Sequence, residues 1–193
     1  MNKKEIKELY QNKRKNLSPK ELNSISEKIC QLLFQQFNFE NKILSVFLPI
    51  EKEKEINTYL ILNKALSIES LVVVPKMNEE KTSLKHYLFE KESELEINTF
   101  GIPEIKKGKL IAADRLDFVI VPLFVSDKKG HRVGYGKGFY DRFLKKCRTN
   151  CIFIGISHFN SFETIDDLHQ GDVKLHYLIC PDKVYRFPVF DEK

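Results

Sequence analysis

The segment DFVIVPLFVSDKKGHRVGYGKGFYDRF, residues 117–143, joins an apolar run, a glycine-rich loop and the start of a helical pattern. Residues 117–121 end at Pro122, which is typical of a buried strand whose ladder stops at a proline. Residues 138–147 follow a helical pattern, and residues 151–156 (CIFIGI) form another buried apolar run. Strand, loop, helix and strand in this order indicate an α/β domain.

The same pattern continues on both sides of this segment. Apolar runs at 42–48 and 71–74 end at Pro49 and Pro75, and a helical pattern near 58–65 separates them. Further along, we expect an exposed strand at 84–89, a turn at 101–104 and a fifth buried strand at 177–180. The expected fold is α/β: a three-layer open sheet of mostly parallel strands with helices on both faces.

Because ligands of open α/β folds bind at the carboxyl ends of strands, the loops after Leu48, Val74 and Val121 should form the rim of a site. We expect each of these three strands to stop at its proline, since proline cannot donate a ladder hydrogen bond.

An N-terminal helical pair precedes the first strand. Residues 3–16 form a charged helix with a thin apolar stripe, Ile6, Leu9 and Tyr10. A second helix starts where Ser18 caps it, Pro19 takes its first position and Glu21 completes a capping box. Its core-facing positions recur at helical spacing and are Leu22, Ile25, Ile29, Leu32, Leu33 and Phe37.

Composition excludes some classes of protein. With 193 residues, 42% hydrophobic and 31% charged, the chain is expected to form a single globular domain over residues 1–193. A net charge of +5 favours anionic ligands without naming one, and no run of about 18 apolar residues suggests a membrane span. The four cysteines form no CxxC pair, and the start lacks the apolar core of a signal peptide. We therefore expect a cytoplasmic monomer with reduced thiols and no membrane or nucleic-acid partner.

The loop carries the chemistry. Gly134, Gly136 and Gly138 let the backbone approach a ligand closely, while Arg132 and Lys137 add positive charge. With the N-terminus of the following helix, these residues predict a phosphate cradle. Asp141 in the first helical turn is suited to hold Mg²⁺ against phosphate oxygens. The spacing matches neither the Walker A loop nor the dinucleotide-binding fingerprint.

The run from Asp127 to Arg142 resembles the signature of the 5-formyltetrahydrofolate cyclo-ligases, also called methenyltetrahydrofolate synthetases. The resemblance covers nearly the whole chain: the basic first helix, Glu55-Ile56-x-Thr58, residues 101–104 and Asp172 fall in family order. It implies an ATP- and Mg²⁺-dependent enzyme that converts 5-formyltetrahydrofolate to 5,10-methenyltetrahydrofolate, releasing ADP and phosphate. The formyl oxygen would be phosphorylated before N10 closes the ring.

The resemblance also implies residue roles. Catalytic roles fall on Arg132, Lys137 and Tyr140, with Lys137 at the γ-phosphate, and the metal-linked acids are Asp141 and Asp172. ATP would be bound by Lys3, Lys7, Arg132, Val133, Gly134, Tyr135, Gly136, Lys137, Gly138, Phe139 and Tyr140. The folate would contact Phe47, Leu48, Glu55, Tyr135, Gly136, Lys137, Gly138 and Phe139. The chain departs from the family pattern at Lys7, Leu123, Ser126 and His176, the last standing where an acid is frequent.

Other hypotheses remain open from residues alone. A phosphosugar isomerase or an acyl-CoA transferase-like enzyme could share this fold, but the Tyr-rich glycine loop argues against both. An RNA-binding module would use the basic N-terminus and the interleaved aromatic residues, yet the charges alternate in sign instead of forming one stripe. The five histidines show no metal-ligand spacing, which excludes a zinc hydrolase.

Overall fold

Eight strands of the described residues form one mixed sheet. The computed structural model describes residues 1–99 and 101–188. The sheet has the order β12-β11-β10-β7-β1-β2-β3-β6. Its strands are β1 (Ile43–Ser45), β2 (Leu71–Met77), β3 (Leu84–Leu88), β6 (Leu110–Ile111), β7 (Phe118–Pro122), β10 (Ile152–Ile156), β11 (Tyr177–Cys180) and β12 (Lys183–Arg186). Two small hairpins pair β4 (Leu95–Ile97) with β5 (Pro103–Ile105) and β8 (Val125–Ser126) with β9 (Arg132–Val133).

The centre of the sheet is parallel, as the apolar runs predict. Strands β11, β10, β7, β1 and β2 pair in parallel, whereas β12, β3 and β6 add antiparallel strands at the edges. Leu44 lies opposite both Val72 and Phe118. Buried strand side chains alternate between two apolar clusters, so Val72 and Val74 face one layer and Val73 faces the other. The prediction of a mostly parallel sheet covered on both faces is confirmed.

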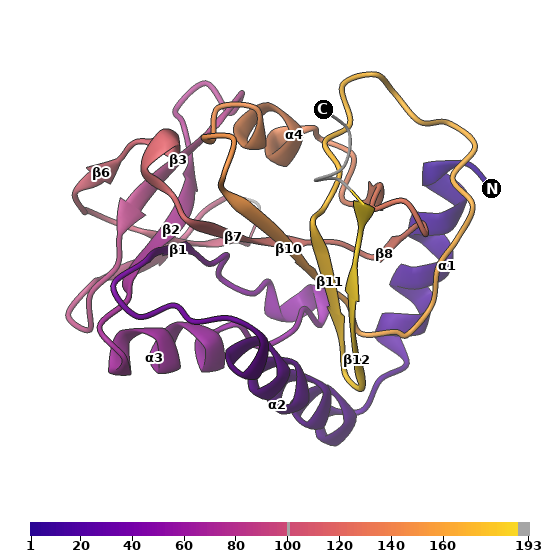
Figure 1. Cartoon of the computed structure of the whole chain (residues 1–193), viewed down its shortest axis with the longest axis horizontal. Helices are drawn as coiled ribbons and strands as arrows, with labels where there is room; N and C mark the ends of the chain where they lie inside the picture. The colour runs from indigo at the N-terminus through magenta and orange to yellow at the C-terminus, as the bar shows by residue number, and fades with distance from the viewer. Residues whose placement is uncertain (100, 189–193) are drawn as a thin grey trace.

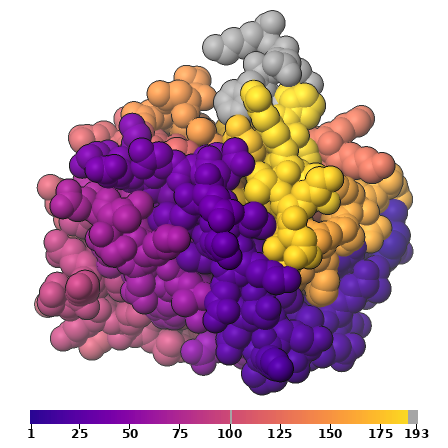
Figure 2. All heavy atoms as spheres, turned by 60° about the horizontal axis from the view of Figure 1, so that its bottom comes forward, coloured from indigo at the N-terminus to yellow at the C-terminus, as the bar shows by residue number. Residues whose placement is uncertain are grey.

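Helices cover the two faces unequally (Figure 1). The cluster on one face is built with α2 (Pro19–Gln36) and α3 (Tyr59–Ser67), and the opposite one with α4 (Phe139–Leu144). Figure 2 turns the first face forward and shows the indigo-to-purple N-terminal residues beside the yellow C-terminal strands. The first helix, α1 (Lys3–Lys15), lies apart from α2, against the segment that contains β8 and β9. The two predicted N-terminal helices therefore serve different surfaces.

The predicted start of α2 is confirmed, but the buried face of α1 differs from the predicted apolar stripe. The Ser18–Glu21 capping box is present at α2, and Asn2 and Glu5 form an unpredicted one at α1. The predicted stripe residue Leu9 is 37% exposed. The buried residues of α1 are Ile6, Tyr10 and Arg14, one every four positions.

The expectation that every strand ends at its proline is wrong for β2, which runs through Pro75 to Met77. The Val46 N–H donates to the Val73 carbonyl, so the backbone groups of Val73 point toward β1. The backbone nitrogen of Pro75, two residues later, points to the same side. The ladder with β1 stops at Val73, so no ladder bond is lost at Pro75. On its other side the strand continues beside β3.

Other boundaries also differ. The run 42–48 is a strand only over β1, the expected helix 138–147 is regular only over α4, and residues 103–104 of the expected turn belong to β5. Short 3₁₀ turns, η1 (Glu51–Glu53) and η2 (Ala113–Arg115), complete the chain. The four cysteines are free thiols, as expected. Over the described ranges, no helix combines the length and apolar character that crossing a membrane requires.

Candidate active site

The glycine-rich loop leaves the carboxyl edge of the sheet after β7. The β8–β9 hairpin turns the chain back, and residues 134–138 lead into α4. Gly136 and Gly138 have φ of 84° and 66°, in the left-handed region that L side chains rarely adopt. A Cβ built on Gly136 meets nothing within 4 Å, so the backbone is open to a ligand there. The helix that follows is shorter than expected, and no side chain caps it.

Two acid–base pairs stand beside this loop. Arg132 donates to Asp141 at 2.8 Å, and Lys3 pairs with Asp172 across 169 positions of the chain. Val173 links the two pairs, because it follows Asp172 in the chain and bonds both members of the other pair. Its N–H donates to Asp141 at 3.1 Å, and its carbonyl accepts from Arg132. The structure thus brings together the first helix, the loop and the two predicted metal-linked acids.

Tyr135 connects the loop to the first helix and to a buried acid. Its carbonyl accepts a hydrogen bond from Lys7 Nζ at 3.2 Å, and its hydroxyl donates to Glu55 Oε1 at 2.7 Å. Glu55 Oε2 accepts from the Ile50 N–H at 2.8 Å. Burial raises the pKa of Glu55, although these hydrogen bonds and the charge of Arg14 oppose that rise. The predicted residues Lys7, Tyr135 and Glu55 therefore form one connected set.

Two further loop residues have unused bonding capacity. The Tyr140 hydroxyl is buried without a hydrogen-bond partner among the described residues, and burial raises its pKa. Lys137 is exposed, and its ammonium forms no ion pair within the described part of the chain. A buried donor and an exposed cation on the same short segment fit an anionic ligand.

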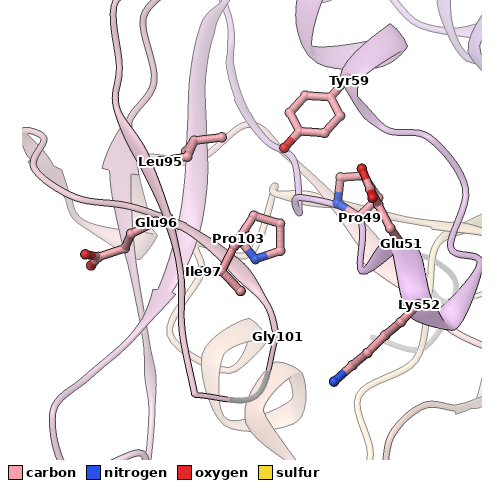
Figure 3. A pocket seen from close by; sticks show the side chains of 9 residues that line it. All are labelled: Pro49, Glu51, Lys52, Tyr59, Leu95, Glu96, Ile97, Gly101 and Pro103. Atoms are coloured by element: carbon pink, nitrogen blue, oxygen red, sulfur yellow. The ribbon is translucent and has the colours of Figure 1, made fainter.

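A pocket of about 400 Å³ opens beside η1 (Figure 3). Across it, Leu95, Ile97 and Pro103 from the β4–β5 hairpin face Pro49 and Tyr59. It lies on one of the predicted rim loops, the one after Leu48, but the sequence did not predict the hairpin. The only sequence signal in this hairpin is the run 101–104, which is predicted to be a turn and falls in family order. The full lining is Pro49, Glu51, Lys52, Tyr59, Leu95, Glu96, Ile97, Gly101 and Pro103.

The remaining candidates lie in the interior. Phe47 and Leu48 are 6% and 4% exposed and pack in the core cluster of α2 and α3, and Val133 is buried against α1. His176 is directed into the sheet, where its Nδ1 accepts from the Phe153 N–H at 2.8 Å. Phe139, at the start of α4, lies under the Arg142 guanidinium, 5.3 Å from the ring centroid. Contact of Phe47, Leu48 and Val133 with a ligand remains a prediction. Among the described residues, no group of three or more His, Cys, Asp or Glu is placed to hold a metal ion.

Fold and site define an α/β protein with a basic, glycine-rich loop at the carboxyl edge of a parallel sheet. The family model described as "5-formyltetrahydrofolate cyclo-ligase family" matches residues 1–169. The chain therefore belongs to the 5-formyltetrahydrofolate cyclo-ligase family.

Individual relatives agree with this membership. A probable 5-formyltetrahydrofolate cyclo-ligase of Schizosaccharomyces pombe is 28% identical over 86% of this chain and 88% of its own. The cyclo-ligase of Escherichia coli K12 is 26% identical over 75% and 80%. The solved 5,10-methenyltetrahydrofolate synthetase of Aquifex aeolicus superposes with a TM-score of 0.82 at 28% identity, covering 97% of this chain and 94% of that one.

Proposed function

We propose that this chain converts 5-formyltetrahydrofolate to 5,10-methenyltetrahydrofolate while ATP is cleaved to ADP and phosphate. Family membership and the names of its relatives support this activity. The observation that carries the proposal is the position of Tyr135. It belongs to the open loop, and its hydroxyl donates to Glu55, which also accepts from the N–H of Ile50, the residue between the pocket-lining Pro49 and Glu51. A phosphate-binding segment and a pocket for a flat ring would therefore be connected through Tyr135 and Glu55.

ATP would bind along the loop from Arg132 to Tyr140, with Lys3 and Lys7 of α1 as a second wall. The open backbone at Gly136 and the unpartnered Tyr140 hydroxyl support this assignment. Backbone N–H groups, the Tyr140 hydroxyl and the Lys137 ammonium are the donors that phosphate oxygens accept from. Lys3, now paired with Asp172, would turn to the phosphates when they arrive.

Mg²⁺ would be held by Asp141 and Asp172. Two carboxylates suit an ion that takes most of its remaining ligands from water and phosphate oxygens, and they need no third acid. Both acids stand beside the loop and are linked through Val173. When bound, Mg²⁺ neutralises phosphate charge and orients the transferring group. In the structure, Asp141 pairs with Arg132 and Asp172 pairs with Lys3.

The folate would enter the pocket between η1 and the β4–β5 hairpin. Tyr59, Leu95 and Pro103 offer apolar surface for a flat ring. Glu55 does not line this pocket, but it holds the N–H of Ile50 beside it, and we propose that its carboxylate accepts from the adjacent N–H donors of the pterin. Phe47 and Leu48 would support this wall from the core. We also propose that the chain acts on these small molecules as a cytoplasmic, single-domain monomer.

The chemistry follows from the weakness of the formamide oxygen as a leaving group. Transfer of the γ-phosphoryl to that oxygen releases ADP. N10 then attacks the activated carbon and loses its proton to the solvent, and phosphate departs with the former formyl oxygen. Arg132 and Lys137 would stabilise the charge of the moving phosphoryl group, with the Tyr140 hydroxyl as a further donor. The remaining task of the protein is to align formyl oxygen, phosphoryl group and N10.

A direct assay tests this proposal. Protein, ATP, Mg²⁺ and 5-formyltetrahydrofolate are mixed, and the near-ultraviolet band of the methenyl product is followed together with ADP. Both products should appear with ATP present and neither without it. A folded protein that produces neither band nor ADP under these conditions would refute the activity.

A further inference from the structure

Arg14 is a buried cation for which the sequence gives no role. It continues the inward-facing stripe of α1 after Ile6 and Tyr10, and it is only 3% exposed. Removing an ionised guanidinium from water is costly unless hydrogen bonds and charge compensate it. Its partners should therefore indicate why it is there.

The guanidinium is directed at the loop and at the strand end behind it. Its Nη2 donates to the Leu123 carbonyl at 2.9 Å and its Nη1 to the Tyr135 hydroxyl at 3.4 Å. It also lies over the Phe124 ring, 4.4 Å from the centroid. No described carboxylate lies within ion-pair distance of the guanidinium. The negative charge connected to it is that of Glu55, to which the Tyr135 hydroxyl donates.

The direction of the hydrogen bonds makes a relay. An ionised Glu55 carboxylate can only accept hydrogen bonds, so the Tyr135 hydroxyl donates a hydrogen bond to Glu55 and accepts one from Arg14. Arg14, Tyr135 and Glu55 are thus joined in one order, cation to hydroxyl to carboxylate. Glu55 is 6% exposed, and Arg14 and Glu55 both line a small cavity next to the strand end at Leu123.

We propose that Arg14 is a positioning residue for the folate: it holds the Tyr135 hydroxyl toward Glu55 and so fixes the carboxylate that receives the pterin. This inference rests on the proposed function. Loss of Arg14 would leave the Tyr135 hydroxyl free to turn and the buried Glu55 without a compensating cation. The effect would fall on the affinity for folate, because Arg14 contacts the Tyr135 hydroxyl that bonds Glu55. The ATP phosphates are assigned to other side chains, those of Lys3, Lys7 and Lys137.

A double-mutant cycle tests the relay. Arg14→Met and Tyr135→Phe are compared with the double variant and with Lys15→Met, which removes the same charge from an exposed neighbour on α1. Each single change should raise the KM for 5-formyltetrahydrofolate about tenfold, and Arg14→Met should change KM for ATP and kcat less than about threefold. Because both changes break the same relay, the double variant should also show about a tenfold rise. Lys15→Met should behave as wild type.

Two results would overturn the relay: an unchanged folate KM in Arg14→Met, or a rise of about a hundredfold in the double variant, which independent effects would give. If Arg14→Met does not fold, Arg14→Lys keeps the buried charge but loses the forked donors. As a single change, Arg14→Lys should raise the folate KM. Combined with Tyr135→Phe, it should cause no further rise, and an additive rise in that double variant would equally overturn the relay. A folded wild-type protein without turnover would refute the proposed function instead. If the wild type is active and the two substitutions act independently, only the relay is refuted.

Discussion

Lys137 is the cation of the loop that is most open to a ligand. Its side chain is exposed without an ion pair in the described residues, so Lys137→Ala should leave the fold intact. We expect turnover to fall about a hundredfold, since preorganised charge at a transferring group is typically worth that much. Steady-state kinetics and thermal unfolding of the variant check both statements.

The matched control is Lys146→Ala, an exposed lysine after α4 that removes the same charge away from the loop. It should keep wild-type turnover. Near-normal turnover in Lys137→Ala would remove this lysine from its role at the γ-phosphate.

Residue types were predictable from the sequence, but their partners were not. The spacing of glycines and cations around Arg132 indicated a phosphate site because those properties belong to the residues themselves. The pairing of Lys3 with Asp172 depends on how α1 docks. The burial of Arg14 depends on the same docking, and an arginine on a charged helix normally indicates a solvent-exposed face.

At the scale of elements, apolar runs and caps predicted the parallel strands and the start of α2, because both signals are local. The β4–β5 hairpin was missed, since residues 90–109 are neither strictly alternating nor strongly apolar. The misjudged end of β2 has a similar origin: whether Pro75 breaks a ladder depends on where its neighbour β1 stops. The unpredicted hairpin forms one wall of the pocket, so the proposed folate side of the site was the harder part to predict.

At the scale of the whole molecule, buried histidines make stability depend on pH. Burial lowers the pKa of His86 and His158 to about 3 and that of His176 to about 4. In the unfolded chain these histidines bind protons near pH ~6.5, whereas in the folded chain they stay neutral. The free energy of unfolding is therefore at its full value above that pH and decreases as pH falls toward 4. We expect urea unfolding at pH ~7 and pH ~5 to differ by about 1–2 kcal/mol for each of these histidines.

Two variants separate this effect from general acid unfolding. His86 stacks on Phe143 with ring centroids 4.0 Å apart, and its Nε2 has no hydrogen-bond partner in the described part of the chain. His86→Phe should therefore remove about a third of the pH dependence. His169 is exposed, and His169→Gln should leave it unchanged. Equal stability of the wild type at both pH values would contradict the burial of neutral histidines.

The central claim is that ATP activates the formyl oxygen of a folate between the glycine-rich loop and the pocket, which Tyr135 and Glu55 connect. Labelling that oxygen with oxygen-18 and analysing the released phosphate by mass spectrometry tests it most directly. The account predicts that each phosphate formed with a methenyl product carries the label, since the oxygen leaves with the phosphoryl group. Methenyl product formed with unlabelled phosphate, and the label found in water, would contradict it.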